Sequence, residues 1–89
     1  MKIELVPDIE HCVETLARKK HAELAQKLLE NEAIDTEAGE KLEILRLFLE
    51  TADFRKLRAE SERHMAEGKS VRFTVYLEDG VPGYQMQVK

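Results

Sequence analysis

The sequence predicts an α+β domain in which three helices pack on one face of a small antiparallel sheet. The first observation behind this prediction is the alternation of apolar and polar residues over residues 70–89, which is typical of a β-hairpin. The second is that three upstream stretches, residues 8–30, 36–50 and 52–67, repeat their apolar residues at helical spacing. The third is the very short connection after Gly68, which must fold the hairpin back beside the preceding helix. Helices gathered on one face of an antiparallel sheet define the α+β class.

Residues 1–6 are short and allow two interpretations. Ile3 and Leu5 alternate with Lys2 and Glu4, so the segment can form a third strand on an edge of the hairpin. A frayed terminus is the alternative.

The first helix is predicted over residues 8–30. Asp8 can accept hydrogen bonds from the free N–H groups of a first turn, and Glu10 places a favourable negative charge there. No glycine or proline interrupts the stretch, which favours one helix over two. Its apolar face contains Ile9, Cys12, Val13, Leu16, Ala17, Leu24, Ala25, Leu28 and Leu29.

The second helix is predicted over residues 36–50, after a connection that spans residues 31–36 and in which Asp35 or Thr36 can cap the helix. Its apolar stripe is wide, which predicts a central helix with neighbours on more than one side. The stripe consists of Ala38, Leu42, Ile44, Leu45, Leu47, Phe48 and Leu49.

A break is predicted at residues 51–53. Between positions 49 and 54 an unbroken helix would turn its apolar face by about 140°, so two helices fit the pattern better than one. Thr51 or Asp53 can cap the third helix, over residues 52–67, and Gly68 can end it by adopting positive φ. Phe54, Leu57 and Met65 are expected to face the sheet.

In the hairpin, the inward faces are expected to be Val71, Phe73, Val75 and Leu77 on one strand and Tyr84, Met86 and Val88 on the other. The link contains Asp79-Gly80, followed by Val81-Pro82-Gly83-Tyr84. Proline followed by glycine is a type II turn signal, and it places the predicted turn at Pro82-Gly83.

Length and composition indicate one domain. The chain has 89 residues, of which 43% are apolar and 36% charged, with a net charge of −4. This charge argues against a dedicated nucleic-acid or acidic-membrane binder, although it leaves room for a local basic patch. The single cysteine excludes an internal disulfide and fits a reducing compartment. The chain shows no signal peptide and no apolar run of membrane-spanning length, so a cytoplasmic location without membrane partners is expected.

The leading functional hypothesis is a non-enzymatic protein–protein interaction module that binds another protein or forms a homo-oligomer. A short sheet leaves unpaired edges, and the hairpin carries only Pro82 and Lys89 to block them. The wide stripe of the second helix is another surface through which a twofold dimer could form. No glycine-rich phosphate loop or nucleophile elbow is present, and no cofactor is expected.

The alternative hypothesis is a nucleic-acid-binding module. Residues 54–72 carry an excess of basic side chains, and one aromatic ring lies on the predicted outer face of the hairpin. Its candidate contacts are Arg55, Lys56, Arg58, Arg63, Arg72 and Tyr76. The simpler interpretation is a solvated face that carries ion pairs such as Arg58–Glu62 and Arg63–Glu67.

A third hypothesis, a small enzyme, needs a cleft that gathers Cys12, a carboxylate and one of the histidines His11, His21 and His64. None of the histidines has metal-ligand spacing, so no metal site is expected. Cys12 itself is predicted to be a small buried apolar group.

Overall fold

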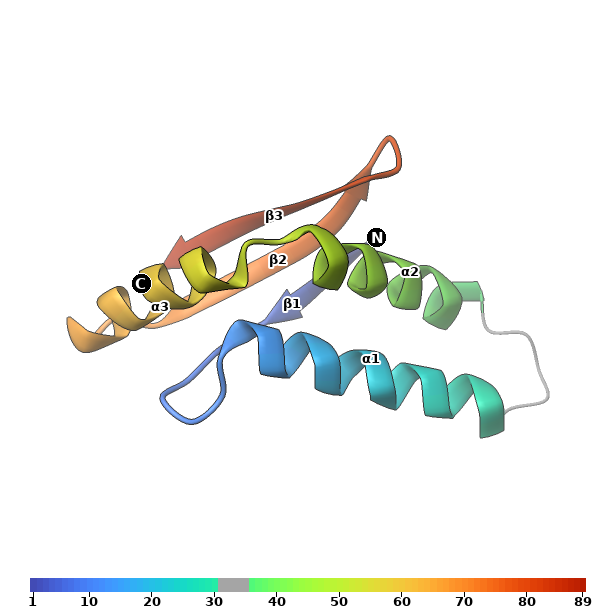
Figure 1. Cartoon of the computed structure of the whole chain (residues 1–89), viewed down its shortest axis with the longest axis horizontal. Coiled ribbons are helices and arrows are strands. Elements are labelled where there is room, and N and C mark those ends of the chain that lie inside the picture. Colours follow the sequence, from blue (N-terminus) through green and yellow to red (C-terminus); the bar gives the residue numbers. More distant parts are fainter. Residues whose placement is uncertain (31–35) are drawn as a thin grey trace.

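The computed structural model describes residues 1–30 and 36–89, and this part of the chain confirms the α+β class (Figure 1). The predicted connection after Glu30 and the predicted cap Asp35 lie outside the described residues. The elements are β1 (Lys2–Leu5), α1 (Val13–Glu30), α2 (Thr36–Thr51), α3 (Phe54–Ala66), β2 (Val71–Glu78) and β3 (Val81–Val88).

The sheet has the order β1-β2-β3, and both pairings are antiparallel. The N-terminal segment is therefore a strand, as one of the two interpretations predicts. Ile3 lies opposite Val75 and Leu5 opposite Phe73, so the buried side chains of β1 and β2 share one face. β2 is the central strand, and both edge strands are hydrogen-bonded to it.

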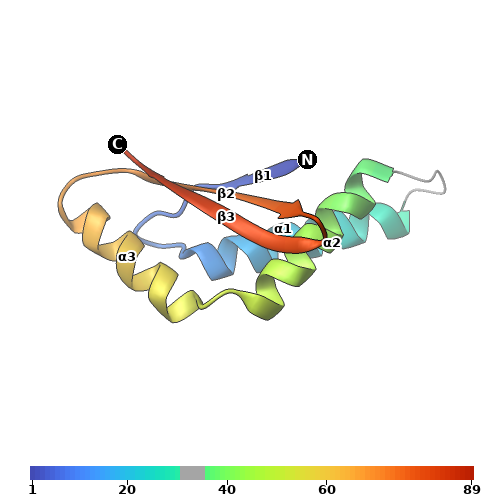
Figure 2. The ribbon, with the colours of Figure 1, turned by 90° about the horizontal axis from the view of Figure 1, so that it is seen from above.

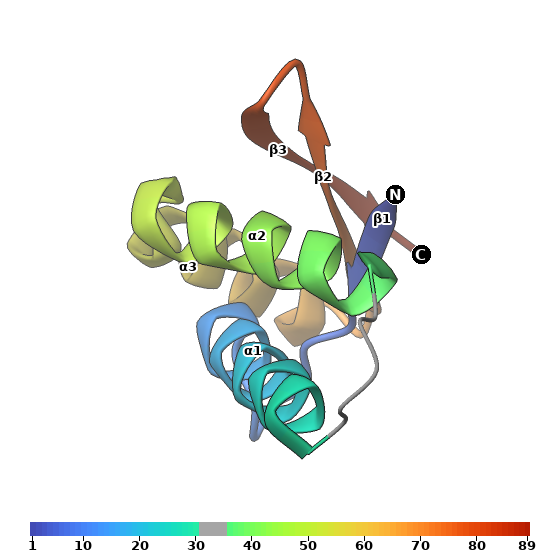
Figure 3. The same cartoon turned by 90° about the vertical axis from the view of Figure 1, so that its right-hand side faces the viewer.

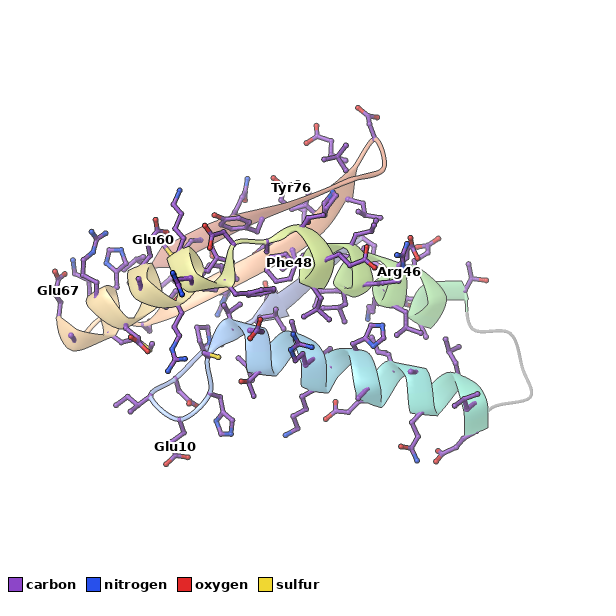
Figure 4. All side chains as sticks on the ribbon, viewed as in Figure 1. Glu10, Arg46, Phe48, Glu60, Glu67 and Tyr76 are labelled. Carbon is purple, nitrogen blue, oxygen red and sulfur yellow. The ribbon has the colours of Figure 1, made fainter. Side chains whose placement is uncertain are left out.

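All three helices cover this one face, and Figures 2 and 3 show the opposite face without a helix. The alternation of the strands explains the arrangement, because one set of side chains enters the core and the other set faces outward. The buried core consists of Ile3, Leu5, Val13, Ala17, Leu24, Ala38, Ile44, Leu45, Phe48, Leu57, Val71, Phe73 and Val75. Phe48 of α2, labelled in Figure 4, is 1% exposed and belongs to this core.

α1 begins at Val13 rather than at Asp8, and it runs unbroken to Glu30. The Asp8 carboxylate accepts the expected backbone hydrogen bonds, from Glu10 at 2.8 Å and from His11 at 2.7 Å. However, the Asp8 N–H donates to the carbonyl of His11, further along the chain, whereas helical N–H groups donate to earlier carbonyls. The turn at residues 8–11 is therefore not a turn of α1, and at the start of the helix the carbonyl of Cys12 accepts the N–H of Leu16. Ile9 is left 95% exposed.

The predicted break between the second and third helices is present. α2 ends at Thr51, and the Asp53 carboxylate caps α3 by accepting the N–H of Lys56 at 3.2 Å. Phe48 and Phe54, on either side of the break, contact each other edge-to-face at 5.3 Å between ring centroids. Gly68 ends the helical region with the predicted positive φ, of 81°.

The hairpin turn lies at Asp79-Gly80 and not at Pro82-Gly83. Both turn residues have positive φ, 52° and 77°, which is the pattern of a two-residue type I′ turn. This turn follows the twist of the flanking strands, whereas a type II turn would splay them. Pro82 and Gly83 consequently lie inside β3, paired with Leu77 and Tyr76.

Candidate interaction edge and the Cys12 pocket

The free edge of β3 exposes unpaired backbone groups. Ser70 and Lys89 exchange two backbone hydrogen bonds, at 2.9 and 3.0 Å. Because hydrogen-bonding direction alternates along a strand, residues 81, 83, 85, 87 and 89 turn their N–H and C=O groups toward β2. Residues 82, 84, 86 and 88 turn theirs toward the free edge. Pro82 has no N–H, but because its backbone faces the free edge, no hydrogen bond to β2 is lost.

The side chains of β3 hold this edge against the core without blocking it. Tyr84 lies 6.2 Å from Phe48 and 6.0 Å from Phe73, measured between ring centroids. Met86 packs against the core cluster next to it. From Val81 to Val88 the strand contains no charged residue. Charged side chains and proline are common means of preventing strand addition, so Pro82 blocks the end of this edge next to the turn, whereas residues 84–88, which have neither, are available to another strand.

The outer face of the sheet is polar, with one aromatic ring upon it. A Cβ atom built on Gly83 would lie 3.0 to 3.2 Å from the ring of Tyr76, so this ring fills the place of the missing side chain. Glycine in a strand weakens it, and an aromatic ring from the neighbouring strand compensates. On the same face, Arg72 Nη1 on β2 lies 3.9 Å from Glu4 Oε1 on β1.

The six predicted contact residues are divided between two sides of the molecule. Arg55, Lys56, Arg58 and Arg63 lie exposed on α3, in the helical layer (Figure 1). Arg72 is exposed and Tyr76 half-buried on the outer face of the sheet, which the helices do not cover. These residues therefore do not form one continuous surface.

The basic residues are also partly neutralised. Arg58 donates to Glu62 at 2.9 Å, as predicted, and this hydrogen bond raises the pKa of its guanidinium. Glu67, the predicted partner of Arg63, instead pairs with Lys69 at 3.1 Å.

A cavity of 440 Å³ lies between the loop before α1 and the side of α3. Cys12 is half-exposed at this cavity rather than buried, and its Sγ lies 3.2 Å from Thr15 Oγ1. The hydrogen bond from Thr15 lowers the pKa of the Cys12 thiol, as do the backbone N–H groups of Thr15 and Glu14 and the charge of Arg58. Figure 4 shows Glu10 at the tip of the loop, pointing away from the helices. The cavity is lined by Pro7, Asp8, Ile9, Glu10, Cys12, Thr15, Arg58, Ser61, Glu62, Met65 and Ala66.

The histidines are not gathered with Cys12 at this cavity. His11 contacts Asp8, at 3.2 Å between Nδ1 and Oδ1. His21 lies in the middle of α1, and His64 near the end of α3, where its Nδ1 is buried without a hydrogen-bond partner in the described part of the chain. Residues 1–30 and 36–89 contain no cluster of His, Cys, Asp and Glu that could hold a metal ion. Within the same residues, no helix combines the length and the apolar character needed to cross a bilayer.

Sequence reasoning missed two residues of these sites. Thr15 bonds Cys12 only because α1 begins at Val13, and Tyr84 lies at the free edge only because the turn is at Asp79-Gly80. The Asp79-Gly80 dipeptide is a strong hairpin signal, and it could have indicated that Tyr84 faces the free edge.

A protein-family model without an assigned function matches residues 1–86. The chain belongs to this family. It is also 44% identical over 50 residues to an uncharacterised protein of Archaeoglobus fulgidus. That match covers 54% of this chain and 59% of the relative. No solved structure matches the chain.

Proposed function

We propose that the protein is a self-associating interaction module, and that two copies join through the free edges of their β3 strands. The observation that carries this proposal is the backbone of residues 84–88, whose N–H and C=O groups at Tyr84, Met86 and Val88 face away from β2. Strand addition to such an edge satisfies these groups and extends the sheet.

The edge is a better interface than the second helix. The apolar stripe of α2 is used within the fold, because Ala38, Ile44, Leu45 and Phe48 are all buried. Leu42 and Leu49 pack against the same core. At the edge, in contrast, Tyr84 remains 38% exposed and Val81 64% exposed. A second copy is the favoured partner because an antiparallel edge is complementary to itself under a twofold axis.

The experiment is the mass of the purified protein by light scattering, across the micromolar concentration range. We expect a dimer that dissociates on dilution. The variant Val88→Pro removes an edge-facing N–H while it leaves the hydrogen bonds to β2 in place, and it should shift the protein to monomer. Lys56→Gln is the control, because this exposed side chain lies on α3, away from the free edge. A monomer mass at every concentration would remove the proposal.

Nucleic-acid binding is the second candidate. In its favour, Arg55, Lys56 and Arg63 are exposed, and their side chains form no ion pair with the residues described here. Such binding should weaken steeply with salt. Unchanged NMR shifts of these residues on addition of an oligonucleotide at low salt would exclude it.

A further inference from the structure

We infer that the two β3 strands pair about a twofold axis that passes between the Met86 residues of the two copies. This inference rests on the proposed function and adds the register, which decides the side chains that meet. The axis is perpendicular to the sheet, so β3 of one copy runs antiparallel to β3 of the other. The helices of both copies then lie on the same side of one continuous sheet.

The backbone groups at the edge decide the register. With the axis at Met86, Tyr84 pairs with the partner copy's Val88, and Met86 pairs with itself. Each of these pairs consists of two edge-facing residues, so every outward N–H and C=O of residues 84–88 is satisfied. Shifting the axis to Gln85 would place Val88 opposite the partner copy's Pro82, which has no N–H to donate. Shifting it to Gln87 would place Tyr84 past the end of the partner copy's β3, which extends to Val88.

The side chains agree with this register. On the helical side, half-buried Met86 contacts Met86 of the partner copy, and Tyr84 contacts the apolar side chain of the partner copy's Val88. On the outer face, Gln85 lies opposite the partner copy's Gln87, where amide groups can hydrogen-bond. No pair along residues 84–88 brings like charges together.

The proposed register also brings Lys89 into a specific contact. Lys89 lies opposite the partner copy's Gly83, which has no side chain of its own. The ring of Tyr76 covers this glycine within each copy. The Lys89 ammonium therefore approaches the half-buried Tyr76 ring of the partner copy across the interface, which is a cation–π arrangement.

Disulfide trapping tests the register directly. In a Cys12→Ser background, one chain carries Gln85→Cys and the other, labelled with ¹⁵N, carries Gln87→Cys. Both positions are exposed. They form a non-hydrogen-bonded pair across the proposed interface, with Cα atoms about 4.5 Å apart, which is close enough for a disulfide.

The chains are equilibrated singly and as an equal mixture in a glutathione redox buffer, and the products are separated by mass. We expect a covalent heterodimer in the mixture and little dimer from either chain alone. Efficient cross-linking of the Gln85→Cys chain with itself would move the axis to Gln85, which overturns the register but keeps the edge. A dimer mass by light scattering without any cross-link would overturn this register, and a monomer mass would overturn the proposed function as well.

The Lys89 contact supplies a second measurement. Lys89→Gln should weaken dimerisation about two- to five-fold, whereas Lys56→Gln on α3 should leave the dissociation constant unchanged. An equal effect of the two variants would show that only the overall charge matters, which contradicts the proposed contact.

Discussion

The two edges of the sheet differ in length, charge and burial. β1 has four residues, of which Lys2 and Glu4 are charged, whereas β3 has eight residues and none is charged. β1 is anchored by Ile3 and Leu5, which are 4% and 5% exposed. The inward side chains of β3 are only partly covered. One edge is therefore short and protected, and the other is long and open.

This difference shows that the length of an edge strand and the charge of its side chains, rather than its position in the sheet, determine whether another strand can add to it. Both edge strands hydrogen-bond to the same β2, and both leave N–H and C=O groups unpaired. Only at β1 do alternating charges stand beside these groups, where they oppose the approach of another strand.

The largest expected effect comes from a residue on which both edges depend. Phe73 is fully buried on β2, opposite Leu5 on one side and Met86 on the other. Phe73→Ala should lower the free energy of unfolding by about 3–5 kcal/mol, as measured by chemical denaturation. Glu78→Gln, at an exposed position of the same strand, is the matched control and should change it little. If the two variants were equally stable, the sheet would not rest on the helices as described.

A smaller effect is expected at the protected edge. Ile3→Ala removes one of the two anchors of β1 and should lower the free energy of unfolding by about 2 kcal/mol. Weaker binding of β1 uncovers the second edge of β2, so species larger than a dimer should appear by light scattering. Lys20→Ala, at an exposed position of α1, is the control. A variant that remains strictly dimeric would show that β1 does not protect this edge.

The sequence predicted the helices, the break between two of them and the inward faces of the hairpin, because each depends on periodic burial. It failed where local chemistry was ambiguous. Asp8 and Asp53 both accept backbone N–H groups three residues ahead, yet only Asp53 starts a helix. After Asp53, Leu57 enters the core and Phe54 packs against it, whereas Ile9 after Asp8 remains 95% exposed. Capping chemistry alone therefore did not determine where α1 begins.

The candidate sites were less accessible to sequence reasoning. The basic residues of α3 were identified correctly as exposed, but their separation from Arg72 and Tyr76 depends on which face of the sheet the helices cover. The open edge was expected, but its register depends on a choice between two adjacent turn signals. Both signals obey turn chemistry, and strand twist decides between them.

The turn itself provides the third test, because it fixes which residues of β3 face the free edge. Gly80→Ala places a side chain at a φ of 77° and should lower the free energy of unfolding by about 1–2 kcal/mol. Gly39→Ala is the matched control, since it lies in α2 with no atom near the added Cβ, and it should stabilise the protein slightly. If Gly80→Ala were neutral in thermal unfolding, the turn would lie elsewhere and the edge assignments would shift.

The smallest effect concerns Cys12, whose cavity lies in the helical layer rather than at either edge. Its pKa lies below the 9.0 of an ordinary thiol, because Thr15 donates a hydrogen bond that favours the thiolate. Thr15→Val should raise this pKa, as measured by the pH dependence of alkylation with iodoacetamide. Thr51→Val, in which the lost hydroxyl bonds Leu47, should not raise it.

Because the pKa of Cys12 is lower in the folded protein than in the unfolded chain, the free energy of unfolding should rise slightly as the pH increases toward 9.0. Alkylation should leave the dimer mass unchanged, since Cys12 and the free edge of β3 are separate surfaces, and dissociation on alkylation would place the interface at the helices instead.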